Sequence, residues 1–122
     1  MKRDMDLVRK ILFAVEAREA RCEKLEIEGH SFEEVGYHCC LLIDAGLALG
    51  VDQKLDQTPE RTCRITSLTN AGHDWLDAAR EDTRWKQAKS IFATMGGVTL
   101  DVAKSILKQL MTEQASRLLG SG

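Results

Sequence analysis

The segment 31–66 constrains the fold most, because a clear helix start is followed by two stretches of alternating polarity. Ser31-Phe32-Glu33-Glu34 is a capping box, in which the Ser31 hydroxyl accepts from a backbone N–H and Glu34 reaches back. Gly46 suits the end of this helix, where a residue of left-handed conformation is needed. Apolar residues then alternate over 47–51 and, after a polar turn around 57–60, over 63–65. The pattern predicts a helix followed by a β-hairpin.

Further helices are predicted on both sides of this segment. Asp4 is a good N-cap for a helix to about Glu19, after which residues 24–28 alternate as a short strand. Thr69 or Asn70 caps a third helix, residues 82–83 cap a fourth that ends at residues 96–97, and Thr99 begins the last. The fold class is therefore mainly α with a small β-hairpin. We expect a single domain over 1–122, with a winged-helix-like core over about 4–82 and C-terminal helices over about 83–119.

Residues 31–77 resemble the winged-helix repressors of the ArsR-like and MarR-like families. The segment 35–47, with His38 and the ending Asp44-Ala45-Gly46-Leu47, is similar to their recognition helix. Residues 68–76 match the Leu-Thr-x-x-Gly-x-x-x-Leu pattern that often follows the wing in those families. The resemblance implies a winged-helix fold, and it says less about function.

A second resemblance spans almost the whole chain. Residues 1–7, 37–47, 72–77 and 80–85 look like a family of short bacterial and phage proteins catalogued as a domain of unknown function. The match implies a winged-helix-like fold and frequent residence in prophages and other mobile elements, and it brings no activity with it. In a helix-turn-helix, a supporting helix directly precedes the recognition helix. Here a short strand and residues 29–30 leave no room for it, so that helix is expected to be missing or reduced.

The charge distribution argues against DNA binding by the helix at 31–45. Residues 25–53 contain six Asp or Glu and no Lys or Arg, whereas DNA affinity comes mostly from basic side chains on phosphates. With Val35, Cys39 and Leu42 toward the core, the outward face is the candidate interaction face, which consists of Glu33, Tyr37, Cys40, Leu41 and Asp44. Lys54, Arg61 and Arg64 are candidate wing contacts. We therefore expect a protein partner, with DNA as the disfavoured alternative.

The four cysteines show no CxxC pair and no zinc-finger spacing. We expect Cys22, Cys39, Cys40 and Cys63 to be small buried or half-buried thiols in a reducing compartment. Neighbouring Cys39 and Cys40 point about 100° apart on a helix, which disfavours shared coordination of one ion. A thiol or metal sensor built from His38, Cys39 and Cys40 is the minor alternative. We predict no metal and no cofactor.

No nucleophile motif, HExxH or phosphate loop is present, so we predict that the protein is not an enzyme. His38 is expected to be a hydrogen-bonded structural residue. Residues 74–84 alternate acidic residues with Arg80 and Arg84, which is typical of a solvated helix face. Trp75 and Trp85 are expected to anchor the core.

The interpretation that results is a non-enzymatic regulatory or accessory protein of a prophage or mobile element, which binds another protein. No apolar run approaches the length of a membrane span, and no secretory signal precedes the first helix, so we expect a cytoplasmic protein. The last helix carries an apolar stripe that either packs on the first helix of its own chain and closes the core or pairs with a second copy in a homodimer. Its candidate oligomer contacts are Leu107, Leu110 and Met111.

Overall fold

The computed structural model of the chain describes residues 1–20, 24–53 and 61–120. By their contacts, the residues fall into two compact units, Met1–His73 and Asp74–Gly122, and each is described by itself. Helices dominate the described residues, and their one sheet is a two-stranded antiparallel hairpin. This confirms the predicted class, mainly α with a small β-hairpin. The contact boundary lies near residue 73 and not near residue 82, while the single domain stays a prediction.

The first helix, α1 (Met5–Ala17), begins where its N-cap predicts. The Asp4 carboxylate accepts from the backbone N–H groups of Asp6 and Leu7, at 3.0 and 3.2 Å. Its five predicted core residues are all buried: Leu7, Val8, Ile11, Leu12 and Val15. Helix and core face are therefore both confirmed.

The second helix, α2 (Phe32–Asp44), carries both hydrogen bonds of the predicted capping box. The Ser31 hydroxyl accepts from the Glu34 N–H at 3.1 Å, and the Glu34 carboxylate accepts from the Ser31 N–H at 3.2 Å. Gly46 follows the helix with a φ of +77°, the left-handed conformation that glycine adopts without strain. Both ends of α2 were thus predictable from local sequence.

The hairpin consists of β1 (Ala48–Gln53) and β2 (Thr62–Leu68), paired antiparallel. An irregularity between Leu49 and Gly50 shifts the register. Leu47 and Ala48 are buried, whereas Leu49 and Val51 are 59% and 48% exposed. The alternating apolar residues of this segment therefore do not share one buried face.

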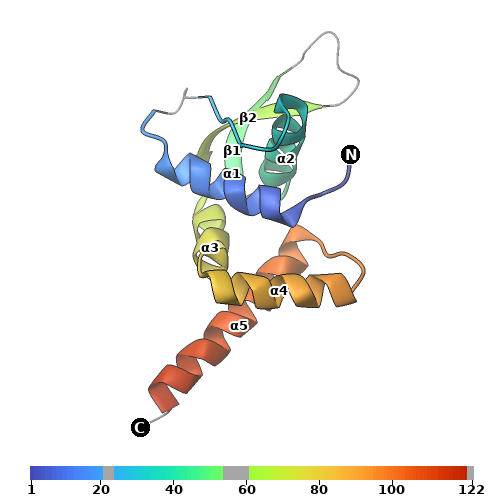
Figure 1. Ribbon diagram of the computed structural model, residues 1–122. Helices are drawn as coiled ribbons and strands as arrows, with labels where there is room; N and C mark the ends of the chain where they lie inside the picture. Colours follow the sequence, from blue (N-terminus) through green and yellow to red (C-terminus); the bar gives the residue numbers. More distant parts are fainter. Residues whose placement is uncertain (21–23, 54–60, 121–122) are drawn as a thin grey trace. The chain divides into compact units, whose positions relative to one another are not determined.

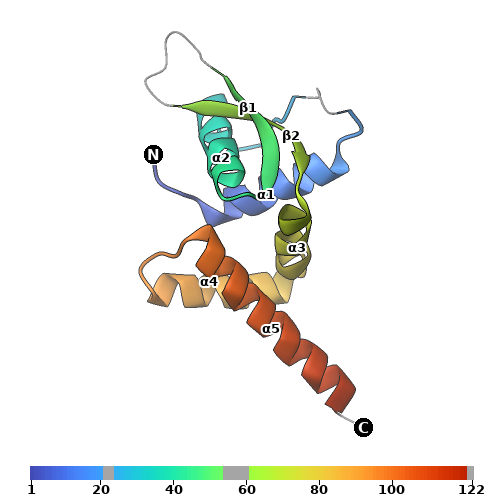
Figure 2. The same cartoon turned by 180° about the vertical axis from the view of Figure 1, so that it is seen from behind.

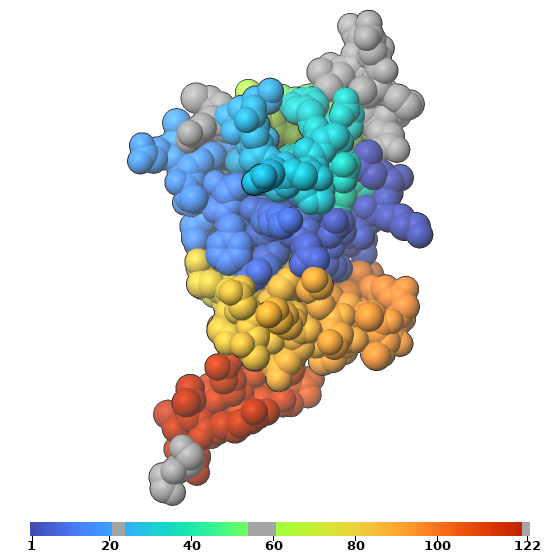
Figure 3. Space-filling view, in the orientation of Figure 1, coloured from blue at the N-terminus to red at the C-terminus, as the bar shows by residue number. Residues whose placement is uncertain are grey.

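In the first unit, α2 lies against the hairpin, and α1 packs across α2 and β2 (Figures 1 and 2). The close approach of α2 to β2 depends on Gly36, because a Cβ at this position would lie 2.9 Å from the Thr62 Cβ. Figure 3 shows α1 in blue and the segment that leads into α2 in cyan, side by side on this unit's surface. The hairpin is thus a packed part of the unit.

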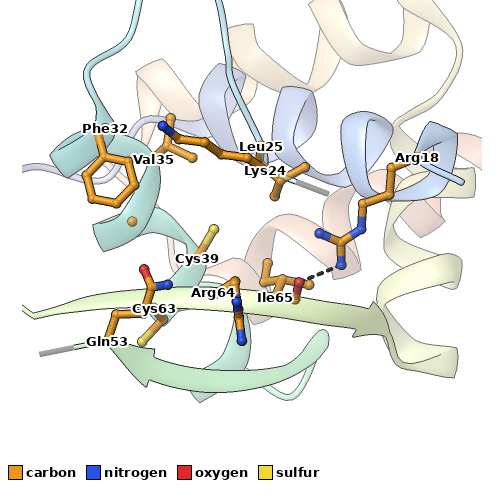
Figure 4. A pocket seen from close by; sticks show the side chains of 11 residues that line it. Arg18, Lys24, Leu25, Phe32, Val35, Cys39, Gln53, Cys63, Arg64 and Ile65 are labelled. Carbon is orange, nitrogen blue, oxygen red and sulfur yellow. Dashed lines mark hydrogen bonds between the residues drawn. The ribbon is translucent and has the colours of Figure 1, made fainter. Parts of the chain in front are cut away.

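The prediction of a strand at 24–28 is wrong. Residues 24–27 have no regular structure, and a turn follows in which the His30 N–H donates to the Ile27 carbonyl at 3.1 Å. A β-strand is held by hydrogen bonds to the backbone of a neighbouring strand. The Ile65 carbonyl of β2 instead accepts a hydrogen bond from the Arg18 guanidinium (Figure 4). Residues 24–31 form no helix either.

Three helices follow the hairpin: α3 (Asn70–Ala79), α4 (Asp82–Thr94) and α5 (Leu100–Gly120). Thr69 and Thr99 cap α3 and α5 by accepting from the N–H groups of Gly72 and Val102, each at 3.1 Å. The cap of α4 is Glu81, one residue before the predicted position. None of the described helices combines the length and the apolar content required to cross a membrane.

The core of the second unit is aromatic, as predicted for the two tryptophans. Trp75 and Trp85 are 0% and 3% exposed, and their rings meet edge to face with centroids 5.9 Å apart. The Trp75 indole N–H donates to the Leu100 carbonyl at 3.1 Å, which joins α3 to the start of α5. Both tryptophans therefore have structural roles.

Arg84 corrects the prediction of a wholly solvated face at 74–84. Arg80 does form an exposed ion pair with Asp77, at 3.0 Å. Arg84 is only 9% exposed, and it donates to the carbonyls of Asp77 and Ala78 and to the Gln114 side chain. This guanidinium thus holds the end of α3 and the middle of α5.

Candidate functional site

The residues of the candidate interaction face of α2 differ in exposure, because the hairpin packs against part of this face. Glu33 and Asp44 are exposed and Tyr37 and Leu41 are half-buried, as an outward face requires. Cys40 is only 2% exposed, so its assignment to this face is wrong. The reason is that β2 packs on α2 beside Gly36, one turn before Cys40.

Cys40 and Cys63 form a disulfide between α2 and β2, with a sequence separation of 23 residues. This corrects the prediction that both are free thiols. The pairing depends on how the hairpin lies on α2, which no cysteine spacing reveals. The one available signal was the pair of small residues Gly36 and Cys40, four apart on a helix, where a strand can approach closely.

An ion-pair network lies next to this disulfide, since its member Asp52 has an oxygen 3.1 Å from the Cys63 sulfur. The Arg61 guanidinium donates to Asp44 at 2.7 Å and to both carboxylate oxygens of Asp52, at 2.9 and 3.2 Å. Hydrogen bonds to Asp52 and then Asp44 raise the pKa of Arg61. A candidate wing contact and a candidate face residue are thus paired with each other, so Arg61 is a poor contact for a phosphate.

Of the other two candidate wing contacts, Lys54 lies outside the described residues. Arg64 is exposed in β2, opposite Val51 in the ladder. Arg64 also lines a pocket, described below, to whose wall Cys63 of the disulfide contributes as well.

His38 is buried, and both ring nitrogens are engaged. Nε2 accepts from the Asp4 N–H at 2.8 Å, and Nδ1 lies 2.8 Å from the Glu34 carbonyl. Since Nε2 accepts, Nδ1 carries the proton and donates to that carbonyl. The predicted structural role of His38 is confirmed, and no ring nitrogen remains for a metal shared with Cys39 and Cys40.

Cys39 is a buried free thiol, as predicted. Burial raises its pKa from an ordinary 9.0 to about 12, although Arg18 and the Ile65 backbone act in the opposite direction. The thiol therefore stays protonated at neutral pH, and a protonated thiol is a poor nucleophile and metal ligand.

A pocket of about 60 Å³ opens between residues 24–25, α2 and β2 (Figure 4). Its apolar lining includes Leu25, Phe32, Val35 and Ile65, with the Cys39 side chain between α2 and β2. Three basic residues complete the rim, Arg18, Lys24 and Arg64, and no Asp or Glu is among the lining residues. This is a distinctive composition in a chain whose net charge is −2.

A second hollow of about 240 Å³ adjoins the pocket over residues 24–31. The two share Lys24, Leu25, Phe32 and Val35, so together they form one groove, which we call the α2 groove. Phe32 is 44% exposed, and Lys24 Nζ lies 5.5 Å from its ring centroid. Sequence reasoning missed this groove, because residues 24–28 were expected to be a paired strand.

The candidate oligomer contacts differ in exposure. Leu107 is fully buried in the second unit and belongs to its core, while Leu110 and Met111 are half-buried. Beyond them, Leu118 and Leu119 are 75% and 86% exposed at the end of α5. The apolar stripe thus continues past the part of α5 that packs in its own unit.

Residues 2–99 match the family model described as "Hypothetical protein (DUF2513)". The chain belongs to this family. An "Uncharacterized protein" of Haemophilus influenzae (strain ATCC 51907 / DSM 11121 / KW20 / Rd) is 35% identical over 122 residues, which cover 98% of this chain and 99% of that protein. No solved structure matches. The matched residues 2–99 of this chain include those that form the disulfide, the ion-pair network and the α2 groove.

Proposed function

We propose that this DUF2513 protein is a non-enzymatic interaction module whose α2 groove holds a segment of a partner protein. The occupant is a stretch with an apolar side chain next to a carboxylate. The observation that carries the proposal is the lining of the smaller pocket, which is apolar inside and has three basic residues and no acidic one. The acidic residue of the adjoining hollow is Glu26, 3.9 Å from Lys24. The resemblance of the sequence to a family of short bacterial and phage proteins supports a regulatory or accessory role in a prophage or mobile element.

Size favours a protein segment over a metabolite. Small-molecule sites usually enclose about 300–1,000 Å³. The pocket has about 60 Å³, room for the end of one side chain, and the adjoining hollow has about 240 Å³, room for a neighbouring residue. The two parts together reach only the lower end of the small-molecule range. A knob of this kind, anchored in a pocket and ringed by polar contacts, is typical of protein interfaces.

Charge supplies the second requirement. Arg18, Lys24 and Arg64 place positive charge around an apolar floor, which favours a carboxylate beside the inserted side chain. DNA is the disfavoured partner, because Arg61 is engaged by Asp44 and Asp52 and Glu33 is exposed on α2. Carboxylates at this surface repel phosphates. A winged-helix-like arrangement is part of this proposal, as the scaffold that presents the groove.

A peptide-display selection on the full chain tests the proposal. We expect enriched peptides to contain Leu, Ile or Phe next to Asp or Glu. Phe32→Ala and Arg64→Glu should each weaken binding by at least about tenfold. Met95→Ala and Lys86→Glu are matched controls, since both residues are exposed in or just after α4 and neither lines the groove.

Two results would overturn the proposal. One is an enriched peptide set that binds the Phe32 and Arg64 variants as well as the wild type. The other is sub-micromolar, sequence-selective binding of duplex DNA at physiological salt, weakened by Tyr37→Ala. That second result would make the protein a DNA-binding regulator.

A further inference from the structure

A thiol and carboxylate cluster lies where α2 meets the hairpin, and one of its members, Cys63, also lines the pocket of the groove. Cys40 of α2 and Cys63 of β2 are joined as a disulfide. Asp52 of β1 faces Cys63 across the ladder, and its Oδ1 lies 3.1 Å from the Cys63 Sγ. The two sulfurs and a carboxylate oxygen all lie within 4.8 Å of one another. Three potential metal ligands therefore converge from three elements.

We propose that reduction of the Cys40–Cys63 disulfide converts this cluster into a Zn²⁺ site with Cys40, Cys63 and Asp52 as ligands. Two equivalents of a low-molecular-weight thiol, or one of a dithiol, reduce the bond and are themselves oxidised to a disulfide. The two cysteine thiols then lose their protons as the metal binds, and two Zn–S bonds form. The proposal does not require an occupant in the α2 groove, although Cys63 lines the pocket of that groove.

The ligand set suits zinc. Zn²⁺ takes thiolate sulfur at about 2.3 Å and carboxylate oxygen at about 2.0–2.2 Å, usually in a tetrahedron. Two sulfurs on one tetrahedral zinc lie about 3.8 Å apart. The Cα atoms of Cys40 and Cys63 are 5.0 Å apart, so rotation of their side chains can separate the sulfurs without moving α2 from β2. Asp52 is exposed, which gives a water molecule access to the fourth position.

Arg61 completes the arrangement as a positioning residue. It donates to both oxygens of Asp52, and it also pairs with Asp44. Two thiolates and a carboxylate exceed the charge of Zn²⁺ by one negative charge, which the guanidinium balances. Residues that orient a metal-binding carboxylate in this way contribute about 10–100-fold to metal affinity. This cluster differs from the sensor set of His38, Cys39 and Cys40 considered above.

The test uses the full chain, reduced with dithiothreitol and desalted under anaerobic conditions. Co²⁺ is added as a spectroscopic probe, and Zn²⁺ then displaces it in the presence of a chromophoric chelator. We expect one metal per reduced chain, with a thiolate-to-cobalt charge-transfer band that is absent from the oxidised protein. Cys40→Ser should abolish the band, and Asp52→Asn should weaken Zn²⁺ binding by at least about 10–100-fold.

Matched variants separate this site from the other thiols. Cys22→Ser and Cys39→Ser remove the remaining cysteines, and Asp77→Asn removes an exposed carboxylate in the second unit. All three should bind Zn²⁺ as the wild type does, and circular dichroism checks that each is folded. The proposal is overturned if the reduced wild type binds no more metal than the oxidised form. It is equally overturned if Asp52→Asn leaves the affinity unchanged, because Asp52 would then not be a ligand.

Discussion

The buried imidazole of His38 accepts a hydrogen bond from the backbone N–H of Asp4, at 2.8 Å. Asp4 is also the N-cap of α1. Its side chain accepts hydrogen bonds from the first turn of α1, while its backbone N–H is bound by a side chain of α2. The second ring nitrogen donates to the Glu34 carbonyl one turn earlier in α2. His38 thereby fixes the start of α1 on α2.

We predict that His38→Ala lowers the free energy of unfolding by about 2–4 kcal/mol. The change leaves the Asp4 N–H without its acceptor and opens a cavity in the core. Urea denaturation followed by circular dichroism measures the loss. His73→Ala is the control, since His73 is exposed and should cost less than about 0.5 kcal/mol. Equal midpoints for the two variants would contradict a structural role for His38.

The disulfide should stabilise the first unit. Closing a loop of this size, with a separation of 23 residues, is worth about 3 kcal/mol in the chain-entropy account. We predict that dithiothreitol, with a chelator present, lowers the urea midpoint of the wild type. Cys40→Ser should show one midpoint whether or not dithiothreitol is added. Oxidised and reduced wild-type protein unfolding together would exclude a stabilising bond.

Cys39 should react slowly with iodoacetamide. A pKa of about 12, against an ordinary 9.0, leaves about 1,000-fold less thiolate at pH 8 in the folded protein. In oxidised Cys22→Ser protein, where Cys39 is the only free thiol by sequence, alkylation should be correspondingly slower than in urea. The rate should rise about tenfold per pH unit through pH 9 without a plateau. A plateau near pH 9 would show that burial does not suppress ionisation.

The same pKa sets a direction for alkaline stability. The thiol of Cys39 holds its proton more tightly in the folded chain than in the unfolded chain. The contribution of this difference to the free energy of unfolding is therefore fully present below pH 9.0. It is lost progressively as the pH rises toward about 12, since only the unfolded chain then ionises. Replacing Cys39 with Ser should make the alkaline unfolding transition less steep in pH.

The end of α5 should mediate self-association. Leu118 and Leu119 are exposed, and half-buried Leu110 and Met111 precede them on the helix. We predict that Leu118→Lys combined with Leu119→Lys shifts the sedimentation coefficient to that of a monomer while helical circular dichroism is retained. Leu107→Asp should instead unfold the second unit, because Leu107 is fully buried. A wild type that sediments as a monomer across a concentration series would refute the contact.

Local signals in the sequence predicted the helices well. Asp4, the Ser31–Glu34 capping box and Thr99 satisfy backbone groups within a few residues, so their positions follow from spacing alone. The left-handed Gly46 ended α2 for the same reason. These features depend little on the rest of the fold.

Features that depend on long-range packing were missed. Cys40 was placed outward, because the helical period does not show that a hairpin closes on the same side as Gly36. Arg84 was assigned to solvent by its acidic neighbours, although its hydrogen bonds reach 30 residues away, to Gln114. The alternation of polar and apolar residues over 24–28 predicted a strand, and this prediction was wrong. The α2 groove exists because these residues form no strand.

The helix α3 begins in the first unit and ends in the second, and each end is held by hydrogen bonds within its own unit. Thr69, which caps its start, donates to the Gly46 carbonyl, whereas Arg84 holds the carbonyls of Asp77 and Ala78 at its end. A cut at the contact boundary would leave four and six residues of a ten-residue helix, and helices so short do not persist alone in water. Hybrids between DUF2513 relatives should therefore be joined outside residues 69–84, and this stretch should be inherited from one parent.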